Sequence, residues 1–379
     1  MMKKIVIIPD SFKGTMSSKE VGKIIKEEAL ASWPEAEVIR AEVADGGEGS
    51  VEAFLSVLPG NREYVTVSGP YREPVRACYA MMEETAVIEM AAAAGLPLVG
   101  DKLSAGATTT YGVGELILAA LDKGAQKIIL GLGGSATNDG GTGMAAALGI
   151  RFLDEKGRCF IPVGNTLEQI AKIEMDGVDQ RLKDIEIIAM CDIRNTLCGA
   201  QGAAAVFGPQ KGATEEEVKR LDKGLFHLAK EIEKVWKKDV LELCGGAAAG
   251  GMGAGAAAFL GAKLQSGIDV VLETIHFDKM LEDCSLVITG EGKIDGQSIQ
   301  GKVVSGVARR ARKKNVPVLV VVGAIDEGAE AMYDEGVSAI FSINQKPLPF
   351  EAIQNRTKSD LRKTVRTIFR FAKLAKQIE

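Results

Sequence analysis

The stretch KKIVIIPDSFKGTMSS, residues 3–18, sets the pattern from which the fold is predicted. Its continuous apolar run, which ends at Asp10, predicts a β-strand buried in a parallel sheet. A short polar loop follows, and Ser17 or Ser18 is suited to cap a helix over about 18–32. The same order returns as the strand EVIRAEV, the loop DGGEGS and the helix VEAFLSVL. Strand, loop and helix in two successive copies indicate a doubly wound α/β fold.

The rhythm of the chain changes near Gly60, where short strands follow one another closely, as in an antiparallel or mixed sheet. Further on, GGAAAGGMGAGAAAFLGAKL predicts a helix that packs closely on a neighbour, because it has little side-chain bulk. From about Leu281 the α/β rhythm returns with three strands. We therefore expect a discontinuous domain, 1–69 and 276–379, whose parallel sheet is built from both chain ends. An α/β domain with a mixed sheet, 70–275, is inserted, and the cleft between the domains is the expected ligand site.

Composition excludes several classes of function. The 379 residues carry a net charge of -5 and only 5% aromatic residues, without the basic run that nucleic-acid binding requires. No apolar run reaches the roughly 18 residues of a membrane-spanning helix, and the N-terminal run is too short for a signal peptide. The six cysteines form no C-x-x-C pair. We expect reduced thiols, a cytoplasmic location and no membrane or nucleic-acid partner, with a homodimer as one possible assembly.

Six apolar segments end in loops that combine glycine with polar and charged residues. These loops are PDSFKG (9–14), ADGGEGS (44–50), TTTYGVG (108–114), GGSATNDGG (133–141), CDIRN (191–195) and TGEGKIDGQS (289–298). Turn formation alone explains any one loop, but not the repeated presence of carboxylates and lysines beside glycine. Because open α/β sheets bind ligands beyond the carboxyl ends of their strands, these loops are the predicted binding site.

The residue types in these loops suit phosphate and a metal ion. Glycine lets backbone N–H groups approach phosphate oxygens, and carboxylates hold Mg²⁺ or orient an attacking hydroxyl. The glycines expected to lie against a nucleotide are Gly46, Gly47, Gly133, Gly134, Gly290 and Gly292. The candidate metal ligands are Asp45, Glu48 and Glu291, and the candidate counter-charges for phosphate are Lys13, Lys211, Lys293 and Lys302.

Other interpretations of the same loops stay open at this point. The segment 296–303 matches G-x-x-x-x-G-K but lacks the Ser or Thr of a true phosphate-binding P-loop. The segment 131–136 matches the dinucleotide fingerprint G-x-G-x-x-A, although the carboxylate of Asp139 follows it. Asp45 and Asp139 would also serve simply as helix caps. A nicotinamide-dependent oxidoreductase and a non-catalytic metabolite-binding protein are therefore the alternative functions.

The chain resembles the bacterial type I glycerate kinases (glycerate 2-kinases) from Lys4 to about Ile343. The resemblance lies in IIPDSFKG, DGGEGS, TAVIEMA, TTTYGVGELI, GLGGSATNDGGTGMAAALG, CDIRNTLCGAQGAAAVFGPQKGA, GMGAGAAAFLGAKLQSGID and VITGEGKIDGQSIQGK. It implies a flavodoxin-like domain built from both chain ends, with an inserted second α/β domain. The sequence departs from the family pattern at Thr196, where proline is usual, and at Gly14, where a bulkier or acidic residue is usual.

The resemblance also implies the activity, and the residue types suggest the roles of the candidate residues. The expected substrate is D-glycerate, phosphorylated at its 2-hydroxyl, with ATP and Mg²⁺ as cofactors. We expect Asp192 to orient the hydroxyl for attack, while Lys13 and Lys302 neutralise the transferred phosphoryl group. The residues expected to bind substrate are Asp10, Ser11, Ser135, Thr137, Asn138, Arg194 and Asn195.

Overall fold

The computed structural model describes residues 2–43, 49–296, 303–344, 346 and 349–378. The chain divides into two compact units, which are described separately below. The first unit comprises 1–45, 52–57 and 268–379, and the second comprises 46–51 and 58–267. Among the described residues, no helix combines the length and the apolar character needed to cross a membrane.

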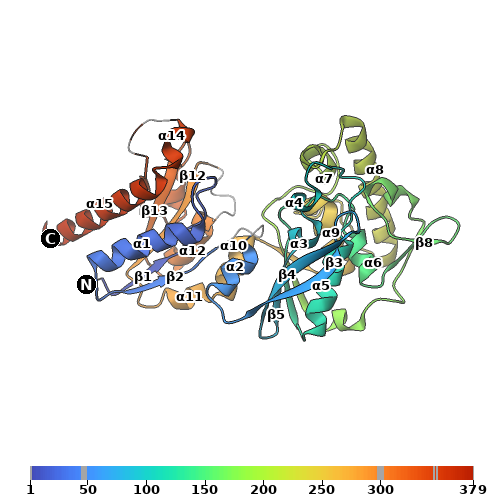
Figure 1. The fold of residues 1–379 in the computed structure, drawn as a ribbon, viewed down its shortest axis with the longest axis horizontal. Coiled ribbons are helices and arrows are strands. Elements are labelled where there is room, and N and C mark those ends of the chain that lie inside the picture. The colour runs from blue at the N-terminus through green and yellow to red at the C-terminus, as the bar shows by residue number, and fades with distance from the viewer. Residues whose placement is uncertain (1, 44–48, 297–302, 345, 347–348, 379) are drawn as a thin grey trace. The chain divides into compact units, whose positions relative to one another are not determined.

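The first unit is built on a five-stranded parallel sheet (Figure 1). Its strands, from edge to edge, are β14 (Ala339–Ser342), β13 (Val318–Ile325), β12 (Leu286–Ile294), β1 (Lys4–Ile7) and β2 (Glu37–Arg40). Numbered along the chain, this is the order 2-1-3-4-5, which defines the flavodoxin-like doubly wound fold. The prediction that both chain ends share one parallel sheet is confirmed, because β1 pairs in parallel with both β2 and β12.

Local signals determine the first helix of this unit. Helix α1 (Ser18–Ser32) begins after Ser17, whose side chain accepts a hydrogen bond from the N–H of Glu20. The Glu20 carboxylate accepts in return from the N–H of Ser17, which completes a capping box. Helix α1 packs beside α15 (Thr357–Ile378), and both bury apolar side chains in one cluster with β1. The remaining helices of the unit are α11 (Phe277–Met280), α12 (Val303–Lys313), α13 (Ala331–Asp334) and α14 (Phe350–Gln354), together with α2 (Ser50–Leu55) and α10 (Gly267–Thr274), whose first residues are assigned to the second unit.

The second unit contains a six-stranded mixed sheet, as predicted for the inserted domain. Its strands, from edge to edge, are β11 (Lys263–Gln265), β10 (Glu186–Met190), β6 (Lys127–Gly131), β5 (Thr85–Glu89), β4 (Pro74–Met82) and β3 (Asn61–Ser68). The first four run parallel, whereas β4 and β3 are antiparallel. A small antiparallel sheet is formed by β7 (Arg151–Leu153), β8 (Cys159–Phe160) and β9 (Lys172–Glu174).

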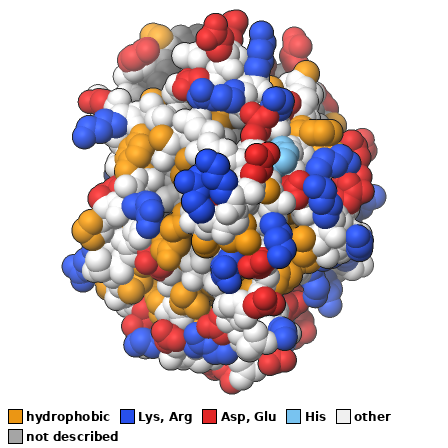
Figure 2. Space-filling model, turned by 90° about the vertical axis from the view of Figure 1, so that its right-hand side faces the viewer, with side chains coloured by type: hydrophobic (Ala, Val, Ile, Leu, Met, Phe, Trp, Pro, Cys, Tyr) orange, Lys and Arg blue, Asp and Glu red, His pale blue; other side chains and the backbone are white. Residues whose placement is uncertain are grey.

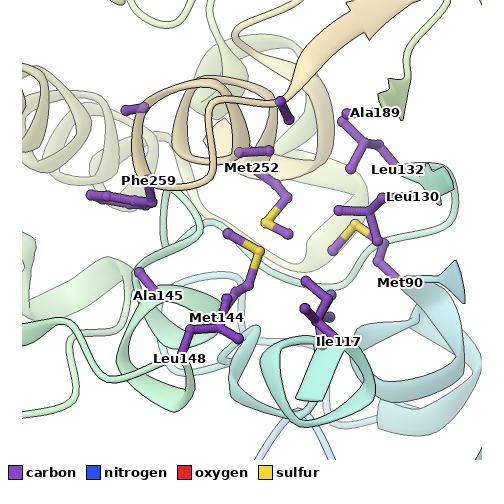
Figure 3. Packing of buried hydrophobic residues seen from close by; sticks show 14 of the residues in the cluster. Met90, Ile117, Leu130, Leu132, Met144, Ala145, Leu148, Ala189, Met252 and Phe259 are labelled. Atoms are coloured by element: carbon purple, nitrogen blue, oxygen red, sulfur yellow. The ribbon is translucent and has the colours of Figure 1, made fainter. Parts of the chain in front are cut away.

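Helices pack around this sheet with little space between them. They are α3 (Ala91–Ala94), α4 (Leu96–Val99), α5 (Tyr111–Asp122), α6 (Thr142–Ala147), α7 (Ala203–Phe207), α8 (Glu215–Trp236) and α9 (Ala248–Phe259). Figure 3 shows the side chains of Met144 from α6 and Met252 from α9 pointing toward each other in the core. The Gly/Ala-rich helix α9 packs as closely as its composition predicts, since a Cβ on Gly255 would lie 2.2 Å from the carbonyl oxygen of Gly140.

The outer surface is charged, and its charges are mixed. On the face shown in Figure 2, basic and acidic side chains are interspersed. Several of the exposed charges are paired, for example Lys223 with Glu168 at 2.7 Å and Lys230 with Glu233 at 2.9 Å. Such exposed pairs contribute little to stability, about 0–1 kcal/mol each.

The divisions between the two units fall before 58 and after 267, ahead of the expected limits at 70 and 275. Strand β3 lies in the second unit because it pairs with β4 along its whole length, from Asn61 to Ser68. At the other division, Ile268 packs against α12, where a Cβ on Gly306 would lie 2.9 Å from its side chain. The change of strand pattern near Gly60 already indicates the first division, whereas a single packing contact such as that of Ile268 carries no separate signal in the sequence.

Candidate functional site

In the first unit, candidate residues converge at the switch point of the sheet, between β1 and β12. The chain leaves β1 toward β2 and leaves β12 toward β13, so the two connections run in opposite directions and open a ligand position. The N–H of Asp10 donates to the carbonyl of Gly290 at 2.8 Å, and the hydroxyl of Thr289 donates to that of Ile8 at 2.8 Å. These bonds fasten the carboxyl ends of the two strands together, with Asp10 on one and Glu291 on the other.

The loop after β1 places further predicted residues at this position. The carboxylate of Asp10 accepts from the N–H of Ser11 at 2.6 Å, which fixes the start of the loop. Lys13 is exposed, whereas Glu291 is 5% exposed. Gly292 lies against the same loop, since a Cβ there would be 3.3 Å from the backbone nitrogen of Lys13. Two carboxylates, a lysine and accessible backbone therefore meet at one sheet edge, which suits phosphate with a cation.

Gly290 has a structural reason to be glycine. A Cβ at this position would lie 2.0 Å from the carbonyl oxygen of Val321 on the neighbouring strand β13. The close approach of the two strands therefore requires glycine at this position, whatever ligand the sheet edge binds. Five of the predicted residues lie outside the described part of the chain: Asp45, Gly46, Gly47, Glu48 and Lys302.

In the second unit, the carboxyl ends of β5, β6, β10 and β11 share one edge of the mixed sheet. Asp192 follows β10, and its Oδ1 accepts from the hydroxyl of Ser266 and the N–H of Gly267, both at 2.9 Å. Asp192 thus joins the loop after β10 to the residues that follow β11. It is exposed, as a residue that contacts substrate must be.

Arg194 and Asn195 continue the loop after β10, but their surroundings differ. Arg194 is exposed, and its side chain forms no hydrogen bond or ion pair with any residue that the structure describes. Asn195 donates to the carbonyl of Gln201 at 2.8 Å and closes a turn. Arg194 is therefore available for an anionic ligand, whereas part of the hydrogen-bonding capacity of Asn195 is used within the chain.

The glycine-rich segment after β6 is mostly buried. Gly134 is exposed and Gly133 partly so, whereas Ser135 is 6% exposed and Thr137 and Asn138 are fully buried. Backbone hydrogen bonds to α3 and α4, and one from the hydroxyl of Thr108 to the carbonyl of Ala136 at 2.9 Å, hold it in place. Only the tip of this segment, Gly133 and Gly134, is open to solvent to a substantial degree.

Asp139 anchors the end of this segment. Its carboxylate accepts from the N–H and hydroxyl of Thr110 at 2.8 Å each, and from the N–H groups of Gly141 at 3.1 Å and Gly143 at 3.2 Å. Burial raises the pKa of Asp139, and these four hydrogen bonds oppose the rise. Asp139 thus accepts from the N–H of Gly143 in the first turn of α6, as a helix-capping carboxylate does, although the N-cap position itself is Gly141.

Lys211 is the residue whose position beside the glycine-rich segment is least evident from the sequence. It is 2% exposed, and its Nζ donates to the Oγ of Ser135 at 2.8 Å and to the carbonyl of Thr137 at 2.7 Å. Burial lowers its pKa to about 7, and the nearby Asp139 carboxylate opposes this shift. Pro209 and Gly212 around it indicate a turn, but no sequence signal shows what the turn packs against.

Two neighbouring side chains hold unused hydrogen-bonding capacity. The Oγ1 of Thr137 and both polar atoms of Asn138 are buried without a hydrogen-bond partner within the described residues. Buried polar atoms are normally paired, so such atoms point to water or a ligand as the partner. Within the same residues, no three His, Cys, Asp or Glu side chains are grouped to hold a metal ion. Mg²⁺ often needs only one or two protein carboxylates together with substrate phosphates, and the Glu291 carboxylate is suited to be one of them.

Comparison with known proteins identifies the family. A model of the glycerate kinase family matches residues 5–373. A glycerate kinase from Bacillus subtilis (strain 168) is 45% identical over 376 residues, 98% of each chain, and a glycerate 2-kinase from Escherichia coli (strain K12) is 46% identical over 343 residues, 90% of each. A crystal structure of a protein from Salmonella typhimurium LT2, designated glycerate kinase 2, matches with a TM-score of 0.89 at 43% identity and covers 100% of both chains. The chain is therefore an enzyme of the glycerate kinase family.

Proposed function

We propose that this enzyme transfers the γ-phosphoryl group of ATP to the 2-hydroxyl of D-glycerate, giving 2-phospho-D-glycerate and ADP. The observation that carries the proposal is the similarity, along at least 90% of the chain, to relatives named glycerate kinase and glycerate 2-kinase. ATP and Mg²⁺ are the proposed cofactors, because a kinase needs a phosphoryl donor and the first unit offers carboxylates and a lysine at its switch point. We also propose that the enzyme is located in the cytoplasm, because ATP is available there.

Glycerate is assigned to the loop after β10. The exposed guanidinium of Arg194 is suited to pair with the substrate carboxylate, and Asn195 lies next to it. The hydrogen bonds of Asp192 to Ser266 and Gly267 fix its carboxylate in position. A fixed carboxylate orients the substrate hydroxyl and receives its proton as the hydroxyl attacks. Ser135, Thr137 and Asn138 are the further polar groups proposed for this substrate.

Phosphate is assigned to the loop after β1 and the end of β12. Asp10 and Ser11 are proposed to contact the transferred group, while Lys13 and Lys302 neutralise its charge. Asp45, Glu48 and Glu291 are the proposed ligands of Mg²⁺, which supplies charge neutralisation on the phosphates when bound. The glycines proposed to border the nucleotide are Gly46, Gly47, Gly133, Gly134, Gly290 and Gly292.

The oxidoreductase alternative is disfavoured by the geometry of the fingerprint segment 131–136. A dinucleotide pyrophosphate binds the free N–H groups at the start of the following helix. Here two of those N–H groups, from Gly141 and Gly143, already donate to the carboxylate of Asp139. A buried carboxylate at that position repels an anionic ligand, so the fingerprint does not predict a dinucleotide site in this chain.

The proposal is tested by coupled ADP release with D-glycerate, ATP and Mg²⁺, followed by phosphorus NMR of the product. Glycerate-dependent turnover with the phosphate on carbon 2 supports it, and a phosphate on carbon 3 overturns the regiochemistry alone. Turnover should disappear with excess chelator and return with Mg²⁺. Absence of turnover with glycerate in both Mg²⁺ and Mn²⁺ overturns the proposed substrate, and other small hydroxy acids are then screened with the same assay.

A further inference from the structure

Lys211 is buried without the carboxylate that normally accompanies a buried ammonium group. It is 2% exposed, and no described residue forms an ion pair with it, although the Asp139 carboxylate acts on it from a greater distance. Burying a charged group without such a partner costs several kcal/mol, so stability alone does not explain a lysine here. Its direct partners are a hydroxyl and a carbonyl of the segment 135–137. This segment leads directly to the accessible turn at Gly133 and Gly134.

The bond from Lys211 determines what the hydroxyl of Ser135 can do. Because the Oγ accepts from Nζ, its own proton is free to be donated, and it donates to no acceptor within the described residues. The N–H groups of Gly133, Gly134 and Ser135 also donate no hydrogen bond to any residue that the structure describes. Gly134 has a φ of 75°, and successive N–H groups around such a residue commonly form a concavity that binds anions.

We propose that the turn Gly133–Ser135 is an anion-binding subsite of this enzyme, and that Lys211 is the positioning residue that orients Ser135 toward the anion. The inference rests on the proposed function and extends it, since it adds Lys211 as a residue that positions the substrate-binding group Ser135 and gives Ser135 a defined role. The ligand is an anionic oxygen, which either the carboxylate of D-glycerate or a phosphoryl group of the nucleotide supplies. The buried polar atoms of Thr137 and Asn138 give the same segment further unused hydrogen-bonding capacity.

The test compares Ser135→Ala and Lys211→Met with the wild type. Isothermal titration calorimetry gives the Kd of D-glycerate and of ADP separately, and initial rates give kcat and KM for D-glycerate and ATP. Lys223→Met is the matched control, because Lys223 is an exposed lysine paired with Glu168. Circular dichroism shows whether each variant is folded. If Lys211→Met does not fold, Ser135→Ala decides the question, since it removes one hydroxyl only.

In both variants we expect Kd and KM for one of the two ligands to increase about tenfold or more. An increase of this size is typical when a hydrogen bond to a charged group is lost. The other ligand should keep its Kd within about twofold. A raised Kd for D-glycerate would identify the bound anion as the glycerate carboxylate. A raised Kd for ADP would identify it as a phosphoryl group of the nucleotide. Ser135→Thr, which restores the hydroxyl, should recover most of the affinity.

The subsite proposal is overturned if folded Ser135→Ala binds both ligands with the affinity of the wild type. It is also overturned if the variant loses affinity for both ligands to the same extent. Turnover by the wild type decides the proposed function independently of these ratios. A wild type that turns over glycerate, with variants that are unaffected, removes the subsite and leaves the function. A wild type that binds ADP but not glycerate removes the substrate assignment, and the ADP titrations alone then decide the subsite. A wild type that binds neither ligand overturns both proposals.

Discussion

The carboxylate of Asp139 accepts hydrogen bonds from both the backbone N–H and the hydroxyl of Thr110, each at 2.8 Å. The two residues are 29 positions apart, so these bonds join two loops that are distant in the sequence. The hydroxyl of Thr110 also accepts from the N–H of Met144 at 2.9 Å, which extends the connection to α6. The glycine-rich segment is therefore held by the fold itself, and only its tip is substantially exposed to solvent.

The first prediction concerns the stability of this connection. Replacing Asp139 with asparagine should lower the free energy of unfolding of the second unit by roughly 2–4 kcal/mol, because it leaves buried N–H donors poorly matched. The chain has two tryptophans, Trp33 in the first unit and Trp236 in the second. In a Trp33→Phe background, urea unfolding followed by Trp236 fluorescence therefore measures the second unit.

Asp122→Asn is the matched control for Asp139→Asn. Asp122 is an exposed carboxylate that pairs with Arg181 at 2.8 Å, so its loss should change stability by no more than about 1 kcal/mol. Equal stability of Asp139→Asn and Asp122→Asn would contradict the anchoring role. Activity is not the readout, since a change in this segment affects both stability and ligand binding.

How much of the fold and of the candidate site can be predicted from the sequence depends on how close in sequence the interacting residues lie. A helix over about 18–32, capped by Ser17 or Ser18, was predicted because a capping residue and its helix are neighbours in sequence. The parallel sheet was predicted because each strand carries its own apolar pattern. Lys211 was recognised only as one of several lysines near the predicted site, because its contact with Ser135 spans 76 residues. Such a contact follows from the packing of complete elements, and no single segment records it.

The second prediction concerns Asp192 and the proposed chemistry. Asp192→Asn should lower kcat for D-glycerate by about 10²–10⁴, because a carboxamide orients the substrate hydroxyl but does not accept its proton. KM should change much less. Ser266→Ala, which removes one of the two described bonds to Asp192, should lower kcat only severalfold, because the N–H of Gly267 still holds the carboxylate. Near-normal turnover in Asp192→Asn would exclude Asp192 as the hydroxyl-orienting group.

The third prediction concerns the pairing of α1 with α15. Glu28 is 4% exposed, and its carboxylate accepts from Arg362 at 2.9 Å and from Arg366 at 2.9 and 3.0 Å. The hydrogen bonds of Arg366, and then those of Arg362, lower the pKa of Glu28 below its ordinary 4.5. This stabilisation is complete above pH 4.5 and is lost as pH falls through the lower pKa of the folded state.

Glu28→Gln should therefore destabilise the first unit by roughly 1–2 kcal/mol at pH 7, because it removes the charged acceptor of Arg362 and Arg366, whose side chains are 39% and 51% exposed. The difference from wild type should shrink as the pH falls below 4.5. Trp33 fluorescence in a Trp236→Phe background reports this unfolding. Glu27→Gln is the control, since Glu27 is exposed and, among the residues that the structure describes, pairs with Arg362 alone. A difference that stays constant down to pH 3 would show that the charge of Glu28 contributes nothing.

The last prediction concerns the pH dependence that Lys211 gives to the second unit. Burial lowers its pKa from 10.5 to about 7 in the folded state, so folding disfavours the charged form. The resulting destabilisation is complete below pH 7, declines as pH rises from 7 to 10.5, and is absent above that range. Lys211→Met removes this titration together with two hydrogen bonds. The free energy of unfolding of the wild type should therefore rise relative to Lys211→Met by roughly 3–5 kcal/mol between pH 7 and pH 10.

Urea unfolding of both proteins at each pH, followed by Trp236 fluorescence in the Trp33→Phe background, measures this difference. Titrations of other groups occur in both proteins and cancel, and Lys223→Met, which removes an exposed lysine, is the matched control. A constant difference for Lys211→Met would mean that Lys211 keeps its ordinary pKa when buried. In that case the Asp139 carboxylate offsets the loss of hydration of the ammonium group, and the two residues form one neutral pair that supports the segment between them.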